Sequence, residues 1–430
     1  MKVAFLVTGS GGSFYCSNCY RDMLYLRAVK NLPGMDAIAI PLYLPPEKIY
    51  VETGFDTNVF FGAISLYIRE KVPFLGNMPA FIDKILDAPP LLRIAAKSAG
   101  TVRTEGLEDL TLNMISSHIT TRENEVRRLV RYLKKNGKPD VIQLSNALII
   151  GLARQIKEQM DVKIVCSLQN EDDWLNEMAE PFQSRAWQMI AEESESIDAF
   201  ISPSTYYKEY FLSMSGISGD NVFVVPSGLD LAESSERSRI PGNPAIGFFS
   251  RVSYHNGFDK LVDAFIILKR EKNFSNLLLN VCGGYTSDDK PFIRQQIDKI
   301  KTAGFKSSVK IYPGFAGRGK KEFLDSIDIM SVPVRKYDGY GLYILEANAS
   351  GIPVVQPATG AFPEILATTG GGILYNPDDT ETLAANIRAL LSDKVMSGKL
   401  GELGRQRTNT LLTHMNMAEG MYKVYKSLNS

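Results

Sequence analysis

Short continuous apolar runs recur along this chain, and each is followed by a turn and then by an amphipathic segment. An apolar run of about four to eight residues bounded by turn residues is typical of a parallel strand buried on both faces. Apolar positions at helical spacing predict the connecting helices, and the alternation of the two predicts an α/β protein. The expected strands are 3–7, 38–42, 139–144, 162–168, 199–202, 222–225, 309–314 and a last one from 354, and the expected helices are 18–31, 123–135, 148–159, 261–270, 342–349, 383–391 and 416–428.

Three local features refine this pattern. The polar stretch 233–244 separates two sets of strands and reads as a linker between two domains. Ser204 precedes an expected helix and is a candidate N-cap. The last helix carries an apolar stripe that predicts packing into a core, formed by Met417, Met421, Tyr422 and Tyr425.

Residues 43–106 interrupt the pattern with an irregular segment rich in proline and aromatic residues. Its apolar clusters can bury against the N-terminal sheet, or they can form an acceptor pocket or a membrane-facing surface. The sequence leaves these alternatives open.

Composition narrows the class of protein. The 430 residues contain 48 Lys plus Arg and 48 Asp plus Glu, so no overall basic field points to nucleic acid. Four cysteines predict no disulfide framework, and Cys16 and Cys19 lack the second pair that a structural zinc would need. No apolar stretch is long enough for a transmembrane helix. We expect a cytoplasmic protein, with peripheral contact at the inner membrane face as a second possibility.

The segment 337–353 carries two acids eight positions apart, Asp338 and Glu346. Between them, Gly339 and Gly341 allow the backbone to approach a ligand closely, and positive φ would be tolerated there. The helix expected from Leu342 would present unpaired N–H groups and a partial positive charge to a phosphate. Glu346, one turn further on, can lean back toward the loop and accept two hydrogen bonds from a vicinal diol such as a ribose.

The order of residues from Asp338-Gly339-Tyr340-Gly341 to Glu346-Ala347-Asn348-Ala349-Ser350-Gly351-Ile352-Pro353-Val354-Val355 resembles the donor-binding motif of retaining GT-B glycosyltransferases of the family-4 type. The family usually has Glu where this chain has Asp338. The resemblance implies two Rossmann-like parallel-sheet domains facing a central cleft. It divides the chain into 1–228, completed by the C-terminal helix 416–430, and a nucleotide-sugar-binding domain at 229–415.

Other segments resemble the family with departures. Arg251 matches the arginine that grips the donor diphosphate, whereas Asn256 occupies the position of the family's lysine. Gln169 falls where the family often has a histidine near the donor sugar, and Glu171 is the acid beside it. The resemblance thus implies Asp338 and Arg251 as catalytic residues and Gln169 and Glu171 as sugar or acceptor contacts. The implied donor-binding set is Gly11, Gly12, Arg251, Asn256, Asp338, Gly339, Tyr340, Gly341, Leu342 and Glu346.

The expected function is the transfer of a hexose-type sugar, with retention, from a nucleotide-diphosphate sugar to a glycan, lipid or small-molecule acceptor. No cofactor or metal is expected, and the acid pairs Asp172-Asp173 and Asp288-Asp289 read as solvated loop residues. A phosphorylase or epimerase of the same fold is a rival, although three histidines supply few titratable groups for an epimerase. A catalytically silent nucleotide-sugar-binding protein is the rival from another class.

Overall fold

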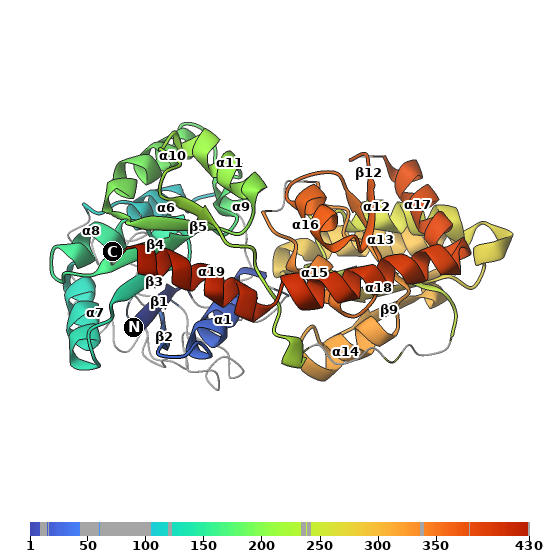
Figure 1. Ribbon diagram of the computed structural model, residues 1–430. Helices are drawn as coiled ribbons and strands as arrows, with labels where there is room; N and C mark the ends of the chain where they lie inside the picture. Colours follow the sequence, from blue (N-terminus) through green and yellow to red (C-terminus); the bar gives the residue numbers. More distant parts are fainter. Residues whose placement is uncertain are drawn as a thin grey trace. The chain divides into compact units, whose positions relative to one another are not determined.

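The computed structural model describes residues 1–8, 15, 17–43, 60, 105–118, 123–233, 238, 242–335, 339–377 and 379–428 (Figure 1). The chain divides into two compact units. The first comprises Met1–Gly12, Asn18–Pro226 and Met417–Ser430, and the second comprises Ser13–Ser17 and Ser227–Asn416. Each unit contains one six-stranded parallel sheet with helices, which confirms the predicted α/β class with two Rossmann-like domains. Most of the irregular segment 43–106 lies outside the described residues.

The first sheet has the strand order β2-β1-β3-β4-β5-β6. Its strands read as continuous apolar runs because both faces are covered. Along β1, Lys2–Val7, the side chains of Val3 and Phe5 enter one core with helices α1 and α19, whereas Ala4 and Leu6 enter a second core on the opposite face.

Helix α19, His414–Ser427, returns to the first unit and crosses its sheet near β3 and β4 (Figure 1). Met417, Met421 and Tyr425 are buried there, and the Tyr425 hydroxyl donates to Gln143 Oε1. One of the four residues of the predicted apolar stripe, Tyr422, is not buried. Tyr422 is 39% exposed, because it lies off the face that Met417, Met421 and Tyr425 share.

The second sheet has the order β12-β11-β10-β7-β8-β9. The chain runs outward from β7 through β8 to β9 and then returns to β10 on the other side of β7. The strand order therefore reverses between β7 and β10. In open parallel sheets, ligands bind outside the carboxyl ends of the strands at such a reversal.

Two helical predictions need correction. The helix expected at 148–159 is a 3-10 turn, η3, followed by a short helix α8. Gly151 separates them, where a Cβ would lie 2.4 Å from the Ser116 carbonyl oxygen.

Helix α18, Lys394–Leu411, was not predicted. It packs closely against α15 because Gly401 and Gly404 carry no side chain, and a Cβ on Gly401 would lie 2.3 Å from the Gly351 oxygen.

The elements of the first unit in chain order are β1 Lys2–Val7, α1 Ser17–Lys30, β2 Asp36–Pro41, α6 Glu108–Ile115, α7 Glu123–Lys135, β3 Val141–Leu144, η3 Ala147–Ile149, α8 Leu152–Lys157, β4 Lys163–Ser167, α9 Glu171–Leu175, α10 Phe182–Glu193, η4 Ser194–Ser196, β5 Ala199–Ser202, α11 Thr205–Ser215, β6 Val222–Val224 and finally α19. Those of the second are η5 Leu231–Glu233, β7 Ala245–Phe249, α12 Phe258–Lys269, η6 Lys272–Phe274, β8 Leu278–Cys282, η7 Ser287–Asp289, α13 Lys290–Thr302, η8 Lys306–Ser308, β9 Val309–Tyr312, α14 Gly317–Asp325, β10 Ile329–Met330, α15 Leu342–Ala349, β11 Val354–Pro357, α16 Phe362–Thr369, β12 Gly372–Tyr375, α17 Thr380–Ser392 and α18.

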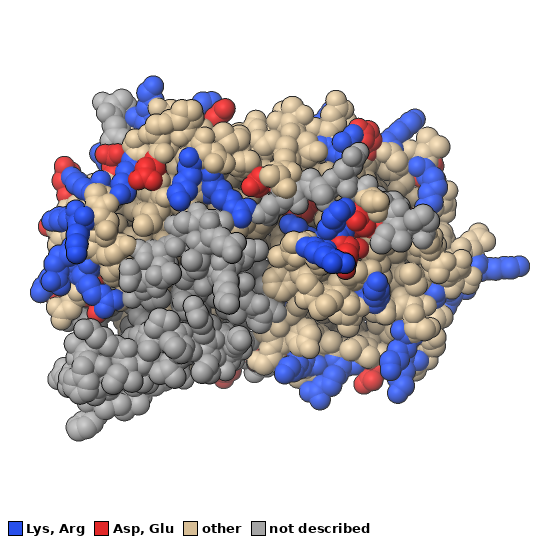
Figure 2. Space-filling view, turned by 90° about the horizontal axis from the view of Figure 1, so that it is seen from below, with Lys and Arg blue, Asp and Glu red and all other residues tan. Residues whose placement is uncertain are grey.

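Basic and acidic side chains are interspersed with uncharged ones over the described surface that faces the viewer in Figure 2. No helix among the described residues combines the length and the hydropathy that a membrane crossing requires.

Candidate functional site

Several described residues of the predicted donor site lie on loops at the carboxyl edge of the second sheet. Arg251 and Asn256 follow β7, and residues 339–341 follow β10 and lead into α15. These two strands flank the reversal of strand order, so the fold places the candidate residues where parallel sheets bind ligands.

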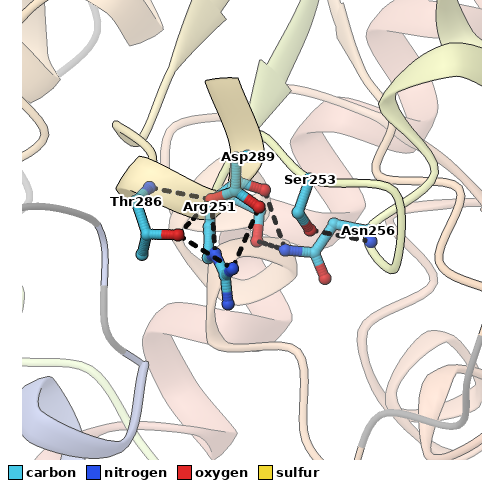
Figure 3. A network of polar contacts seen from close by, with 6 residues as sticks. Arg251, Ser253, Asn256, Thr286 and Asp289 are labelled. Atoms are coloured by element: carbon cyan, nitrogen blue, oxygen red, sulfur yellow. Dashed lines mark hydrogen bonds and ion pairs between the residues drawn. The ribbon is translucent and has the colours of Figure 1, made fainter. Parts of the chain in front are cut away.

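The Arg251 guanidinium is held by Asp289 and Thr286 (Figure 3). Nε donates to Asp289 Oδ2 at 2.9 Å, while Nη2 donates to Asp289 Oδ1 at 2.9 Å and to Thr286 Oγ1 at 3.1 Å. The Asp289 side chain is 8% exposed and also accepts from Thr286 N in a capping box at η7. The interpretation of Asp289 as a solvated loop acid is therefore wrong. The bidentate pair fixes the orientation of the guanidinium.

Asn256 stabilises the loop that carries Arg251. Its Nδ2 donates to the Arg251 carbonyl oxygen at 2.8 Å and to Ser250 Oγ at 3.1 Å, and its backbone N–H donates to Ser253 Oγ at 3.3 Å (Figure 3). Gly257 follows with φ of +69°, and a Cβ there would lie 1.7 Å from the Pro333 oxygen. The Asn256 amide thus closes a tight loop at the position of the family's lysine.

The loop before α15 is glycine-rich for a steric reason. Gly341 has φ of −77°, so it does not use the positive φ that glycine would tolerate. A Cβ on Gly341 would instead lie 2.9 Å from the Phe362 ring and 3.1 Å from Ile344. Tyr340 anchors the loop, because its hydroxyl donates to the Ser227 carbonyl oxygen at 2.8 Å.

Helix α15 is buried on all sides. The expectation of unpaired N–H groups at its start is wrong for two residues. Leu342 N–H donates to Tyr340 O at 3.0 Å, and Ile344 N–H donates to Gly341 O at 2.9 Å. Asn348, where the family has Met, bonds the oxygens of Ile352 and Gly371 and so fixes the far end of the helix.

Glu346 lies on α15 with 4% of its surface exposed and both carboxylate oxygens bonded. Lys320 Nζ donates to Oε1 at 2.7 Å, and the Tyr15 hydroxyl donates to Oε2 at 2.6 Å. Tyr15 also donates its backbone N–H to Gly283 O at 2.7 Å, at the end of β8. Burial, together with the Glu346 charge, raises the pKa of the nearby Cys282 thiol to about 12, against lowering by the Lys320 charge.

In the first unit, Gln169 and Glu171 follow β4 and face inward. Gln169 Nε2 donates to Asp22 Oδ1 at 2.5 Å. The Glu171 carboxylate accepts from Ala147 N at 2.8 Å, from Gln169 N at 3.1 Å and from the Tyr207 hydroxyl at 2.7 Å. Glu171 is thus an internal acceptor for three donors.

Asp172 also departs from the sequence interpretation. With 4% of its surface exposed, it is buried at the first turn of α9, so the prediction that it is solvated is wrong. Its neighbour Asp173 is exposed.

Three predicted residues, Gly11, Gly12 and Asp338, lie outside the described part of the chain. Within the described part, no three His, Cys, Asp or Glu side chains gather in a group that could hold a metal ion.

Comparison with known families covers both units. Residues 115–233 match the family Glycosyltransferase Family 4, and residues 232–407 match Glycosyl transferases group 1. The two matches together span more than half of the chain and adjoin at residues 232–233. This chain belongs to the group 1 glycosyl transferases.

Solved structures agree with this assignment of fold. Sucrose-phosphate synthase from Thermosynechococcus elongatus is 17% identical with a TM-score of 0.73, and the match covers 100% of this chain and 99% of that one. HepE of Anabaena, solved in complex with UDP, is 14% identical with a TM-score of 0.70 and coverage of 99% and 100%.

The curated relatives of this group 1 glycosyl transferase include the lipopolysaccharide core mannosyltransferase LpsB of Rhizobium meliloti. It is 27% identical over 44% of this chain and 53% of its own length. The chain spans about half the length of the curated relatives it matches first.

Several residues of this group 1 glycosyl transferase site were not predicted from the sequence. Asp289 had a local signal, since Thr286-x-x-Asp289 is a capping-box spacing. Tyr15 had none, because it is 331 positions from the Glu346 carboxylate that its hydroxyl bonds.

In this group 1 glycosyl transferase, Asp22 of the first unit is expected to make the free energy of unfolding depend on pH. Burial raises the pKa of its carboxyl to about 7, against smaller lowering by the Arg21 charge and the Gln169 hydrogen bond. The folded state therefore holds the proton more tightly than the unfolded chain. The resulting stabilisation is full below pH 3.8, the ordinary pKa, and is lost as pH rises through about 7.

We expect Asp22→Asn to remove this dependence while keeping an oxygen that accepts from Gln169. The free energy of unfolding of the unmodified protein should fall by about 2–3 kcal/mol more than that of the variant between pH 5 and pH 8. Urea titration of both proteins at the two pH values measures the difference, and parallel curves would contradict it.

Proposed function

We propose that this chain transfers a hexose-type sugar from a nucleotide-diphosphate sugar to a glycan, lipid-linked or small-molecule acceptor with retention of anomeric configuration. The observation that carries the proposal is Glu346, a buried carboxylate bonded by Lys320 and Tyr15 on the helix that follows the reversal of strand order. A carboxylate has about four acceptor sites, so it can accept from a ribose diol as well.

The remaining roles follow from charge and position. Arg251 and the glycine loop before Leu342 are proposed to bind the diphosphate. A guanidinium has five N–H donors, so the pairing through Nε and Nη2 is compatible with a phosphate contact. In the reaction, the bond between the anomeric carbon and the β-phosphate oxygen breaks, the acceptor hydroxyl oxygen bonds to that carbon, and the hydroxyl proton passes to the leaving diphosphate. Preorganised donors stabilise the charge that develops on the leaving diphosphate.

The comparisons support the donor class. HepE, which has the same fold, was solved with UDP, and LpsB is named as a mannosyltransferase. We therefore propose UDP-glucose and GDP-mannose as the first donors to test.

The test is release of the nucleoside diphosphate, followed with each donor and a mixture of phospholipid, sugar-phosphate and oligosaccharide acceptors. Proton NMR of the purified product reports its anomeric configuration. Product with the configuration of the donor supports the proposal, whereas an inverted product contradicts retention. Binding of the donor without release of the nucleoside diphosphate would instead support the alternative of a catalytically silent nucleotide-sugar-binding protein.

We also expect transfer to persist in 5 mM EDTA, because Arg251 and the loop before α15, rather than a metal ion, are proposed to stabilise the diphosphate. Rates with and without the chelator, measured at saturating donor, check this. Activity lost in EDTA and restored by Mg²⁺ or Mn²⁺ would contradict this expectation. The acid pairs Asp172-Asp173 and Asp288-Asp289 would then be the first candidate ligands for the metal ion.

A further inference from the structure

The loop after β7 contributes little net positive charge in this chain. Arg251 is paired with a buried carboxylate, and Asn256 is an uncharged amide bonded to its own loop (Figure 3). A nucleoside diphosphate carries at least two negative charges, and two phosphate cations are implied at this loop by the family resemblance. Other residues of the second unit must therefore help to balance the charge of a bound diphosphate.

Lys320 lies on α14, the helix that follows β9, with its side chain 11% exposed. Its ammonium is 2.7 Å from Glu346 Oε1. The Tyr15 hydroxyl on Oε2 carries no charge, so of the two described side chains that bond the Glu346 carboxylate, Lys320 is the cation. Without it, Glu346 would be a buried negative charge that repels a diphosphate.

The neighbouring lysine is engaged differently. Lys321 Nζ bonds Asp325 Oδ2 at 2.9 Å, one turn along the same helix, and its side chain is 41% exposed. The two adjacent lysines thus suit a comparison, because each bonds a carboxylate: Lys320 bonds Glu346 of the donor motif, and Lys321 bonds Asp325.

We propose that Lys320 is a positioning residue for the donor: it orients Glu346 toward the ribose and, by neutralising that carboxylate, keeps it from repelling the diphosphate. This inference rests on the proposed function. Lys320 acts through the Glu346 carboxylate on the ribose and through its charge on the diphosphate. Loss of that charge should therefore weaken diphosphate binding more than nucleoside binding.

Isothermal titration of UDP, GDP, uridine and guanosine tests the proposal, with circular dichroism to verify folding. Lys320→Met should lower the affinity at least tenfold for whichever nucleoside diphosphate binds the unmodified protein. Lys321→Met should leave that affinity within twofold of the unmodified value. Lys320→Arg should keep most of the affinity. If Lys320→Met does not fold, Lys320→Gln retains an N–H donor for Glu346 without the charge and is expected to show the same loss.

A rescue separates charge from packing. Asn256→Lys in the Lys320→Met background should recover part of the affinity for the diphosphate and none for the nucleoside. Equal losses in Lys320→Met and Lys321→Met would overturn the role of Lys320. If neither nucleoside diphosphate nor UDP-glucose nor GDP-mannose binds the unmodified protein, the proposed function itself fails and the inference fails with it.

Discussion

Glu346→Ala is expected to lower the affinity for the nucleoside diphosphate, and the rate of transfer, by at least an order of magnitude. The substitution removes the acceptor proposed for the ribose diol, and hydrogen bonds to a charged group contribute roughly 1.5–3 kcal/mol each. It also leaves the Lys320 ammonium in a site where its side chain is 11% exposed. Titration calorimetry and initial rates on the same preparation measure both effects.

A loss of stability has to be separated from a loss of binding. Removing one partner of a buried ion pair typically costs about 3–5 kcal/mol of folding free energy. Glu346→Gln keeps the shape and can accept from Tyr15, so it is the variant to compare with Glu346→Ala.

Glu322→Ala is the matched control. Glu322 lies on α14 and pairs with Arg318 on the surface, where an ion pair contributes about 0–1 kcal/mol. Glu346→Ala with unchanged affinity and unchanged rate would remove Glu346 from the donor site.

Local signals in the sequence predicted much of the framework. Continuous apolar runs predicted most of the strands, because strands of a parallel sheet are buried on both faces, but β12 was not predicted. Ser204 was predicted as an N-cap, and its Oγ accepts from Tyr207 N at 3.0 Å. Helix α15 begins and ends at the predicted residues, since glycines flank it on both sides.

The partners of the site residues could not be predicted in the same way. Arg251 was identified from its motif, but its binding by Asp289 depends on the loop after the neighbouring strand β8. The Asn256 side chain points into its own loop because its amide bonds the Ser250 hydroxyl and the Arg251 carbonyl oxygen, and these contacts exist only in the folded loop. Motif spacing reports which residue types are present, whereas the orientation of a side chain depends on contacts made after the sheet has formed.

The second large effect is expected from Arg251→Ala, which should cost about 2–4 kcal/mol of transition-state stabilisation, the scale for losing one preorganised donor at developing charge. Because the guanidinium is oriented by Asp289 and Thr286, Arg251→Lys should recover little: an ammonium cannot reproduce the bidentate pair. The ratio of kcat/KM for each variant to that of the unmodified protein gives the free-energy difference.

Two further variants decide whether the effect arises from the diphosphate or from a lost ion pair. Arg388→Ala breaks a comparable Arg–Glu pair with Glu271 outside the loops after β7 and β10, and should leave kcat/KM within about twofold. Asp289→Asn keeps an acceptor for Arg251 but removes the carboxylate charge, so the guanidinium would face the diphosphate without a competing anion. If the diphosphate binds Arg251, this variant should bind free UDP or GDP more tightly.

If Arg251→Ala binds the diphosphate as tightly as the unmodified protein does, Arg251 serves only the fold of its loop, and its ion pair with Asp289 is structural.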